Sequence, residues 1–224
     1  MDVGHAGPRL RTATLLDLRA DHAIARDAVW DDTDCSVADD LGFVTVQTLV
    51  NDKEEYLRRP DLARGFSDES LAYLRRHAAP GADLQIIAAD GLSVAAVQEN
   101  LARIYPELIR LAGARGYSTG TPIYVRYGRV ATMDKISEAL QAKVTVLLVG
   151  ERPGLGCRTS MSCYMAWEAS PDKPEAQRNV VSNIHDGGLP PEAAAERIIS
   201  IAADMFRYRT SGVELNRLLH RVAR

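Results

Sequence analysis

Two glycine-rich loops carry the side chains of this chain best suited to hold a ligand. The run TPIYVRY leads into Gly128 and Arg129, and the apolar run KVTVLLV leads into GERPGLG (150–156). In open α/β sheets, ligands bind beside the loops at the carboxyl ends of the strands. Glycine also lets backbone N–H groups approach a bulky ligand. The sequence therefore predicts a ligand site at these loops, with a tight turn held by glycine and Pro153 as the structural alternative for the second loop.

The spacing of the glycines excludes the two common nucleotide-binding motifs. GLGCRT (154–159) lacks the third glycine of G-x-G-x-x-G, and the chain contains no G-x-x-x-x-G-K-[ST]. A dinucleotide or P-loop site is therefore not indicated.

Other polar residues have both a functional and a structural interpretation. Asp90 in DGLS follows an apolar run, so it either caps the next helix or faces the same crevice as Glu151. Arg126 and Arg129 fit an anionic or amide-rich ligand, a subunit contact or an ion pair. His185 in SNIHDGG has the chemistry of a general base or a metal ligand, but no second ligand stands at a useful spacing. We therefore predict no metal site.

The three cysteines predict free thiols. Cys35, Cys157 and Cys163 form no CxxC pair and have no evident base nearby in sequence. The sequence therefore gives no indication of a cysteine nucleophile.

Composition excludes several classes of protein. The chain has 224 residues, a formal net charge of −3 and 46% hydrophobic residues, as in an ordinary globular protein. This charge gives no general reason to bind nucleic acid or an anionic membrane. No apolar run is long enough to span a bilayer, and MDVGHAGPRLRT lacks the apolar core of a secretory signal. We expect a cytoplasmic protein.

The first 80 residues predict mainly helical structure. Apolar spacing indicates an amphipathic helix over 12–30, followed by an acidic loop over 31–40. GFVTVQTLV (42–50) alternates as a short strand or hairpin arm. Pro60 and Ser67 are suited to open further helices.

The rest of the chain predicts an α/β fold. Strand-type and helix-type segments alternate as β-α-β-α-β, which favours a parallel sheet with right-handed crossovers. The long helix capped by Ser93 contains Pro106, which predicts a kink or a division. In order, the segments are DLQIIAAD, the helix from Ser93 to Gly113 or Gly116, TPIYVRY, MDKISEALQ, KVTVLLV, SMSCYMAW, NVVSNI and a helix from about Pro191 to Tyr208.

Motifs in nearly every part of the chain resemble the small (light) subunit of ethanolamine ammonia-lyase, an adenosylcobalamin-dependent enzyme. In chain order they are GHAGPRLRT, RADHAIARDAV, DKEEYLRRPDLARGF, IIAADGLSV, GTPIYVRYGRV, LLVGERPGLG, SCY and SNIHDGGLPPEAA. A chance match of so many ordered segments is very improbable.

The resemblance implies a Rossmann-like domain (81–224), preceded by a mainly helical domain (1–80). It also implies that adenosylcobalamin lies between this subunit and a large subunit carrying the substrate pocket and the reacting groups. We therefore expect this chain to supply no catalytic acid, base or nucleophile. The family's cofactor contacts fall on Val130, Glu151 and Val180; relatives can have cysteine at the last position, where a backbone or apolar contact tolerates valine. Neighbouring candidates are Arg126, Gly128, Arg129, Ser182 and Asn183.

The implied activity is conversion of ethanolamine to acetaldehyde and ammonia by a hetero-oligomer of repeated heterodimers. Many relatives carry a longer segment before the GxAGPR motif, which begins here at Gly4. In relatives that segment is linked to packaging into a protein microcompartment. The expected location is the cytoplasm, and whether the chain lies within a bacterial microcompartment there is left open. Two other functions stay open: a stand-alone Rossmann-like enzyme acting on a nucleotide or small anion through Asp90, Glu151 and His185, and a scaffold without cofactor contact.

Overall fold

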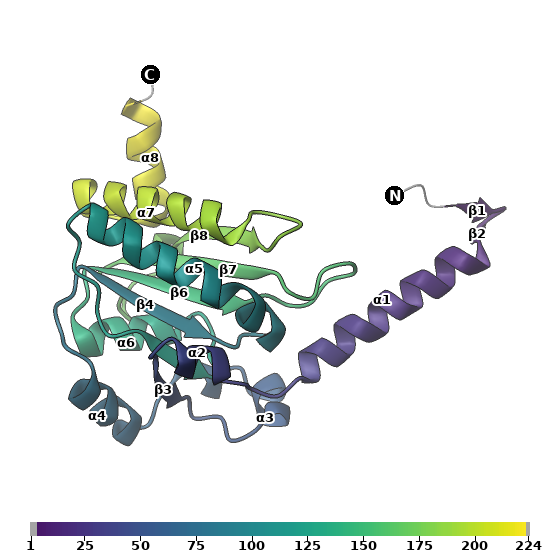
Figure 1. Ribbon diagram of the computed structural model, residues 1–224, viewed down its shortest axis with the longest axis horizontal. Coiled ribbons are helices and arrows are strands. Elements are labelled where there is room, and N and C mark those ends of the chain that lie inside the picture. The colour runs from purple at the N-terminus through teal and green to yellow at the C-terminus, as the bar shows by residue number, and fades with distance from the viewer. Residues whose placement is uncertain (1–3, 223–224) are drawn as a thin grey trace.

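A computed structural model describes residues 4–222, and its centre is a six-stranded sheet with helices on both faces (Figure 1). A two-stranded antiparallel pair precedes it. The strands are β1 (His5–Ala6), β2 (Arg9–Leu10), β3 (Val44–Gln47), β4 (Leu84–Ala89), β5 (Ile123–Arg126), β6 (Val144–Gly150), β7 (Met161–Trp167) and β8 (Asn179–Ile184). The helices are α1 (Thr12–Trp30), α2 (Ser36–Asp40), α3 (Lys53–Arg58), α4 (Asp68–His77), α5 (Val94–Ala114), α6 (Thr132–Leu140), α7 (Pro191–Tyr208) and α8 (Gly212–Val222), with short 3-10 turns η1 (Leu62–Arg64) and η2 (Glu175–Gln177).

The sheet is mostly parallel, which confirms the predicted α/β class. Its strand order is β3-β5-β4-β6-β7-β8. The first four strands pair in parallel, while β7 pairs antiparallel with β6 and with β8. All residues of β4 and of β6 are buried. Such continuous apolar strands occur where helices cover both faces of a sheet.

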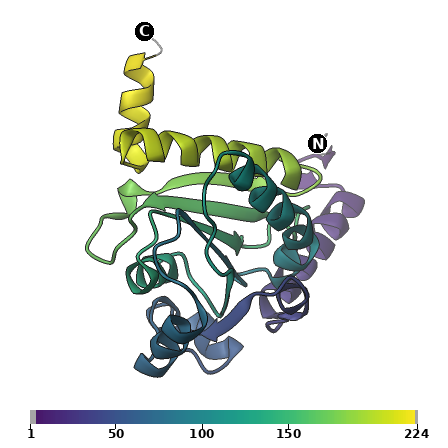
Figure 2. The same ribbon diagram turned by 60° about the vertical axis from the view of Figure 1, so that its left-hand side comes forward.

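Alternate residues of β4 contact the two helical layers. Leu84 and Ile86 point into the core formed with α5 and α7, whereas Ile87 points into the core formed with α4 and α6. Figure 2 shows α5 and α7 on one side of the sheet and α4 and α6 on the other. The period-two burial of a strand thus fixes which helix each side chain contacts.

Capping residues start the helices that the sequence predicted. The Ser67 hydroxyl accepts a hydrogen bond from the Ser70 N–H (3.1 Å), and the Ser93 hydroxyl accepts one from the Ala96 N–H (3.1 Å). Pro191 occupies the first turn of α7, where its missing N–H costs nothing. Pro106 lies inside α5 and does not divide it.

The structure corrects two local predictions. Residues 36–40 of the expected acidic loop form α2, because Ala38 and neighbouring apolar side chains pack on the core beside α5. The amphipathic helix α8 was not predicted; it starts at Gly212, whose φ of +67° suits glycine.

Residues before position 80 also contribute to the main sheet. β3 pairs with β5 in parallel from Val44 opposite Ile123 to Gln47 opposite Arg126. The remaining regular structure of this region, apart from β1 and β2, is helical. A domain boundary at residue 80 remains a prediction.

Helix α1 has the predicted bounds and projects away from the sheet (Figure 1). Ala28 is its one fully buried residue, while Leu16, Leu18, Ile24 and Trp30 are 57%, 41%, 51% and 54% exposed. Across residues 4–222, no helix combines the length and apolar character needed to cross a bilayer.

Candidate functional site

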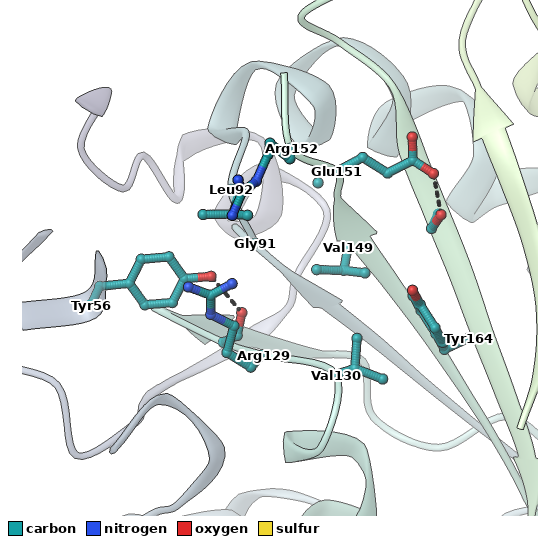
Figure 3. Close-up of a pocket in the computed structure, with 12 residues that line it drawn as sticks. Tyr56, Gly91, Leu92, Arg129, Val130, Val149, Glu151, Arg152 and Tyr164 are labelled. Atoms are coloured by element: carbon teal, nitrogen blue, oxygen red, sulfur yellow. Dashed lines mark hydrogen bonds between the residues drawn. The ribbon is translucent and has the colours of Figure 1, made fainter. Parts of the chain in front are cut away.

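Three loops meet at the carboxyl ends of the parallel strands and enclose a cavity of ≈340 Å³ (Figure 3). They follow β4, β5 and β6. Because β4 leads into α5 on one face and β5 leads into α6 on the other, the chain diverges here and leaves a crevice. The lining residues are Tyr56, Gly91, Leu92, Gly128, Arg129, Val130, Val149, Gly150, Glu151, Arg152, Ser162 and Tyr164.

Glycine allows the loops after β4 and β6 to touch. A Cβ atom on Gly91 would lie 2.1 Å from the carbonyl oxygen of Gly150, and one on Gly150 would lie 2.0 Å from the carbonyl oxygen of Ser93. The Leu92 N–H donates to the Gly150 carbonyl oxygen (3.0 Å). The two loops therefore form one continuous backbone wall of the cavity.

Tyr56 forms part of the cavity wall and was not predicted from the sequence. Its ring is fully buried and its hydroxyl donates to the carbonyl oxygen of Gly128 (3.2 Å). The guanidinium of Arg129 lies 4.4 Å from the centre of the same ring, and the Arg129 N–H donates to the Ala63 carbonyl oxygen (3.0 Å). A cation over an aromatic face is attracted by the ring quadrupole. Residues from the first 80 thereby hold the glycine loop after β5.

The predicted residue Glu151 lines the cavity, and its carboxylate is already hydrogen-bonded. It accepts from the hydroxyls of Ser160 (2.5 Å) and Ser162 and from the N–H of Asn183 (3.4 Å). Burial disfavours its charge, but these donors prevail and lower the pKa of Glu151. The carboxylate therefore braces β7 and the end of β8, and it offers its remaining acceptor capacity to the cavity.

Val130 and Val180 lie on either side of Tyr164. Val130 lines the cavity beside Tyr164, and both side chains pack against the core formed with α4 and α6. Val180 is not among the lining residues, but it pairs with Tyr164 across β7 and β8 and is 46% exposed. Paired residues of neighbouring strands project from the same face. Val180 thus extends the apolar surface outward from the cavity.

Asp90 is buried and does not line the cavity. Its side chain accepts from the N–H of Tyr127 (2.8 Å), and its other oxygen has no partner among residues 4–222. Desolvation raises the pKa of Asp90, against the opposing effects of the nearby Tyr124 hydroxyl and of the Tyr127 N–H. Ser93 caps α5 instead, so neither sequence interpretation of Asp90 is correct. Its carboxylate holds the backbone at Tyr127, whose φ is +54°.

His185 and Arg126 are also engaged away from the cavity. The Gly187 N–H donates to Nδ1 of His185 (3.1 Å), which leaves Nε2 to donate to the Asn183 side-chain oxygen (2.9 Å). Nε of Arg126 donates to the Thr33 hydroxyl (3.0 Å). The cavity therefore contains Glu151 without Asp90 or His185, and the three-residue arrangement of a stand-alone enzyme is not formed.

Among the described residues, no group of three or more His, Cys, Asp or Glu side chains is arranged to hold a metal ion. The three cysteines are free, as predicted.

Comparison with known proteins identifies the family. The sequence model described as "Ethanolamine ammonia-lyase light chain (EutC)" matches residues 1–216. This chain belongs to the ethanolamine ammonia-lyase light chain family. The match includes the three loops after β4, β5 and β6, and it confirms the resemblance seen in the sequence.

Individual light chains are similar over nearly the whole chain. The ethanolamine ammonia-lyase small subunit of Clostridium acetobutylicum is 55% identical over 213 residues, which are 95% of this chain and 88% of that protein. The small subunit of Clostridium tetani is 44% identical over 95% of this chain and 72% of its own length. That of Listeria monocytogenes is 42% identical, with 94% and 72% covered.

Proposed function

We propose that this chain is the small subunit of an adenosylcobalamin-dependent ethanolamine ammonia-lyase and that it forms part of the cofactor site. When bound, adenosylcobalamin supplies the adenosyl radical that abstracts a hydrogen from ethanolamine on the way to acetaldehyde and ammonia. Family membership together with the cavity at the strand ends carries this proposal. The whole enzyme belongs to ethanolamine catabolism.

The residues present fit one side of a corrin. A corrin offers an apolar face and a rim of amide side chains. The cavity supplies apolar surface from Leu92, Val130 and Val149, extended by Tyr164 and Val180, and polar groups from Glu151 and Ser162. Its ≈340 Å³ lies near the lower limit for sites of drug-sized ligands, and a cobalamin is larger. This chain therefore provides one wall, and a large subunit provides the other.

Each predicted contact then has a distinct role. Val130 and Val180 provide apolar surface, and the charged Glu151 carboxylate accepts hydrogen bonds from amide groups at the rim. Arg129, held over Tyr56, contributes a cation at the cavity wall. These residues orient the cofactor and exclude water, while the reacting groups belong to the large subunit.

The same proposal includes the domain organisation, the partner and the location of this chain. Residues 81–224 form a Rossmann-like domain, preceded by a mainly helical region with α1 as an exposed arm. The chain assembles with the large subunit as repeated heterodimers, without nucleic acid or membrane. Its location is the cytoplasm, with a bacterial microcompartment as the alternative.

An ammonia-release assay tests the proposal. Adenosylcobalamin and ethanolamine are given to this chain alone, to the large subunit alone and to the co-expressed pair. We expect ammonia from the pair only, and retention of the corrin absorbance by the pair in gel filtration. A stable pair that neither releases ammonia nor retains cobalamin would refute the proposal, and ammonia from this chain alone would support a stand-alone enzyme.

A further inference from the structure

A second pocket of ≈280 Å³ adjoins the cavity and is lined by three arginines. It shares Arg129, Val130 and Tyr164 with the cavity. Its arginines come from separate parts of the chain: Arg64 from η1, Arg129 from the loop after β5, and Arg178 from the residue before β8. The remaining lining residues are Ala131 and Glu175.

One of the three arginines forms ion pairs with both carboxylates near this pocket. Arg178, with its side chain 10% exposed, pairs with Asp134 at 2.7 Å and with Glu175 at 3.3 Å. Arg64 is exposed, and neither it nor Arg129 forms an ion pair within residues 4–222. The three arginines thus outnumber the two carboxylates, and the surplus positive charge is carried by Arg64 and Arg129.

Arg129 has an unsatisfied donor here. Its Nε atom is buried and has no hydrogen-bond acceptor among the described residues. Leaving a buried charged donor unpaired is costly. Because this atom is buried and the guanidinium lies over Tyr56, an anion in the adjoining pocket would stabilise the charge of Arg129 through space and not by a hydrogen bond to Nε.

The N-terminus of α6 adds to the positive electrostatic potential of this pocket. Val130 and Ala131, which line the pocket, immediately precede α6, and no side chain caps this helix. The N–H groups of the first turn already donate to the carbonyl oxygens of residues 129–131. The helix therefore contributes only the partial positive charge of its N-terminus. This feature reinforces the arginines and is secondary to them.

We propose that the Arg64–Arg129–Arg178 pocket binds a phosphate group, the phosphodiester of the nucleotide tail of cobalamin. This rests on the proposed function. A planar guanidinium matches the oxygens of a phosphate, and the shared lining residues place the pocket directly beside the corrin wall. The other source of the same chemistry is free inorganic phosphate.

Cobinamide has the corrin but lacks the nucleotide tail and its phosphate. Comparing it with cobalamin therefore separates the contribution of the corrin to binding from that of the phosphate. Equilibrium dialysis measures the dissociation constants of cyanocobalamin and dicyanocobinamide for the complete complex with the large subunit. Arg64→Gln is compared with wild type and with Arg75→Gln, an exposed arginine on α4. A lost charged hydrogen bond predicts about tenfold weaker cyanocobalamin binding for Arg64→Gln. Dicyanocobinamide binding stays unchanged, and Arg75→Gln behaves as wild type.

Several results would overturn this assignment. Equal weakening for both corrinoids would mean that Arg64 contacts the corrin rim or supports the fold, and not the phosphate. No weakening for either corrinoid would mean that Arg64 does not contact the cofactor. Arg64→Glu gives a second check, because reversing the charge must weaken cyanocobalamin binding further. Circular dichroism verifies that each variant is folded.

A titration with inorganic phosphate tests whether the pocket binds free phosphate instead. Titration of the cofactor-free complex is followed by ³¹P NMR in wild type and Arg64→Gln. Phosphate binding lost in the variant, combined with unchanged cyanocobalamin affinity, would assign the pocket to free phosphate and refute the cofactor assignment. A wild-type complex that binds neither corrinoid better than the large subunit alone would instead refute the proposed function.

Discussion

At the residue scale, the glycines at the strand ends are required by backbone contact. A Cβ on Gly150 would overlap two backbone groups that cannot move independently of β4 and α5: the carbonyl oxygens of Ser93 (2.0 Å) and Asp90 (2.5 Å). Gly113, exposed on α5, meets nothing within 4 Å. The same chemical change therefore has opposite consequences at the two positions.

We predict that Gly150→Ala destabilises the chain by about 1–3 kcal/mol, as overpacking does. Gly113→Ala should stabilise it by up to about 1 kcal/mol, because alanine has the higher helix propensity. Urea unfolding measures both. Equal stability of the Gly150→Ala variant and wild type would show that the loops can separate without cost.

The charge of Glu151 should make stability depend on pH. Its pKa in the folded chain lies below the ordinary value of 4.5, so its charge stabilises the fold above that pH. This contribution disappears as the pH falls through the folded-state pKa. Glu151→Gln should therefore lose less stability than wild type between pH 7 and about pH 3, a range that extends below the ordinary pKa of 4.5.

Urea unfolding midpoints at the two pH values test this difference. Glu69→Gln, an exposed residue of α4, is the matched control and should follow wild type. An identical pH response of Glu151→Gln and wild type would contradict the hydrogen-bonded, ionised carboxylate.

At the element scale, one buried ion pair joins α6 to the start of β8. The Arg178 and Asp134 side chains are 10% and 9% exposed and lie 2.7 Å apart. Desolvation raises the pKa of Asp134 against the opposing effect of Arg178. Removing one partner leaves the other buried and uncompensated.

We predict that Arg178→Met costs about 3–5 kcal/mol. The double variant Arg178→Met, Asp134→Leu should recover part of that loss, because no buried charge remains unpaired. Denaturant unfolding of both variants tests the pair. A double variant less stable than Arg178→Met would show that the ion pair is not the reason for the loss.

At the scale of the whole molecule, burial separates the sheet and its helices from the projecting α1. Leu101 on α5 is fully buried in the core, whereas Leu16 on α1 is 57% exposed. Deleting a buried leucine side chain removes contacts and leaves a cavity, but deleting an exposed one does neither.

Leu101→Ala should therefore destabilise the chain by about 2–5 kcal/mol, and Leu16→Ala should change its stability by no more than about 0.5 kcal/mol. Thermal and urea unfolding distinguish the two. A large loss in Leu16→Ala would mean that α1 packs on the sheet in solution.

Much of the fold was readable from local sequence. The limits of α1 follow from the apolar spacing along it. The caps at Ser67 and Ser93 and the proline start of α7 follow from side chains at the helix starts. The alternation of apolar strands and helices predicted a mostly parallel sheet, and the two glycine loops predicted the place of the cavity. Ordered motifs along the chain were sufficient to recognise the family.

Only the tertiary structure decided how distant residues meet. Tyr56 reaches Gly128 because β3 and the helices after it pack beside β5, and nothing near Tyr56 in sequence signals this. Asp90 is buried and does not line the cavity, and its side chain accepts a hydrogen bond from the N–H of Tyr127, which follows the neighbouring strand β5. The physical reason is general: periodicity and capping are local, whereas strand order and loop contact join residues that are far apart in the chain.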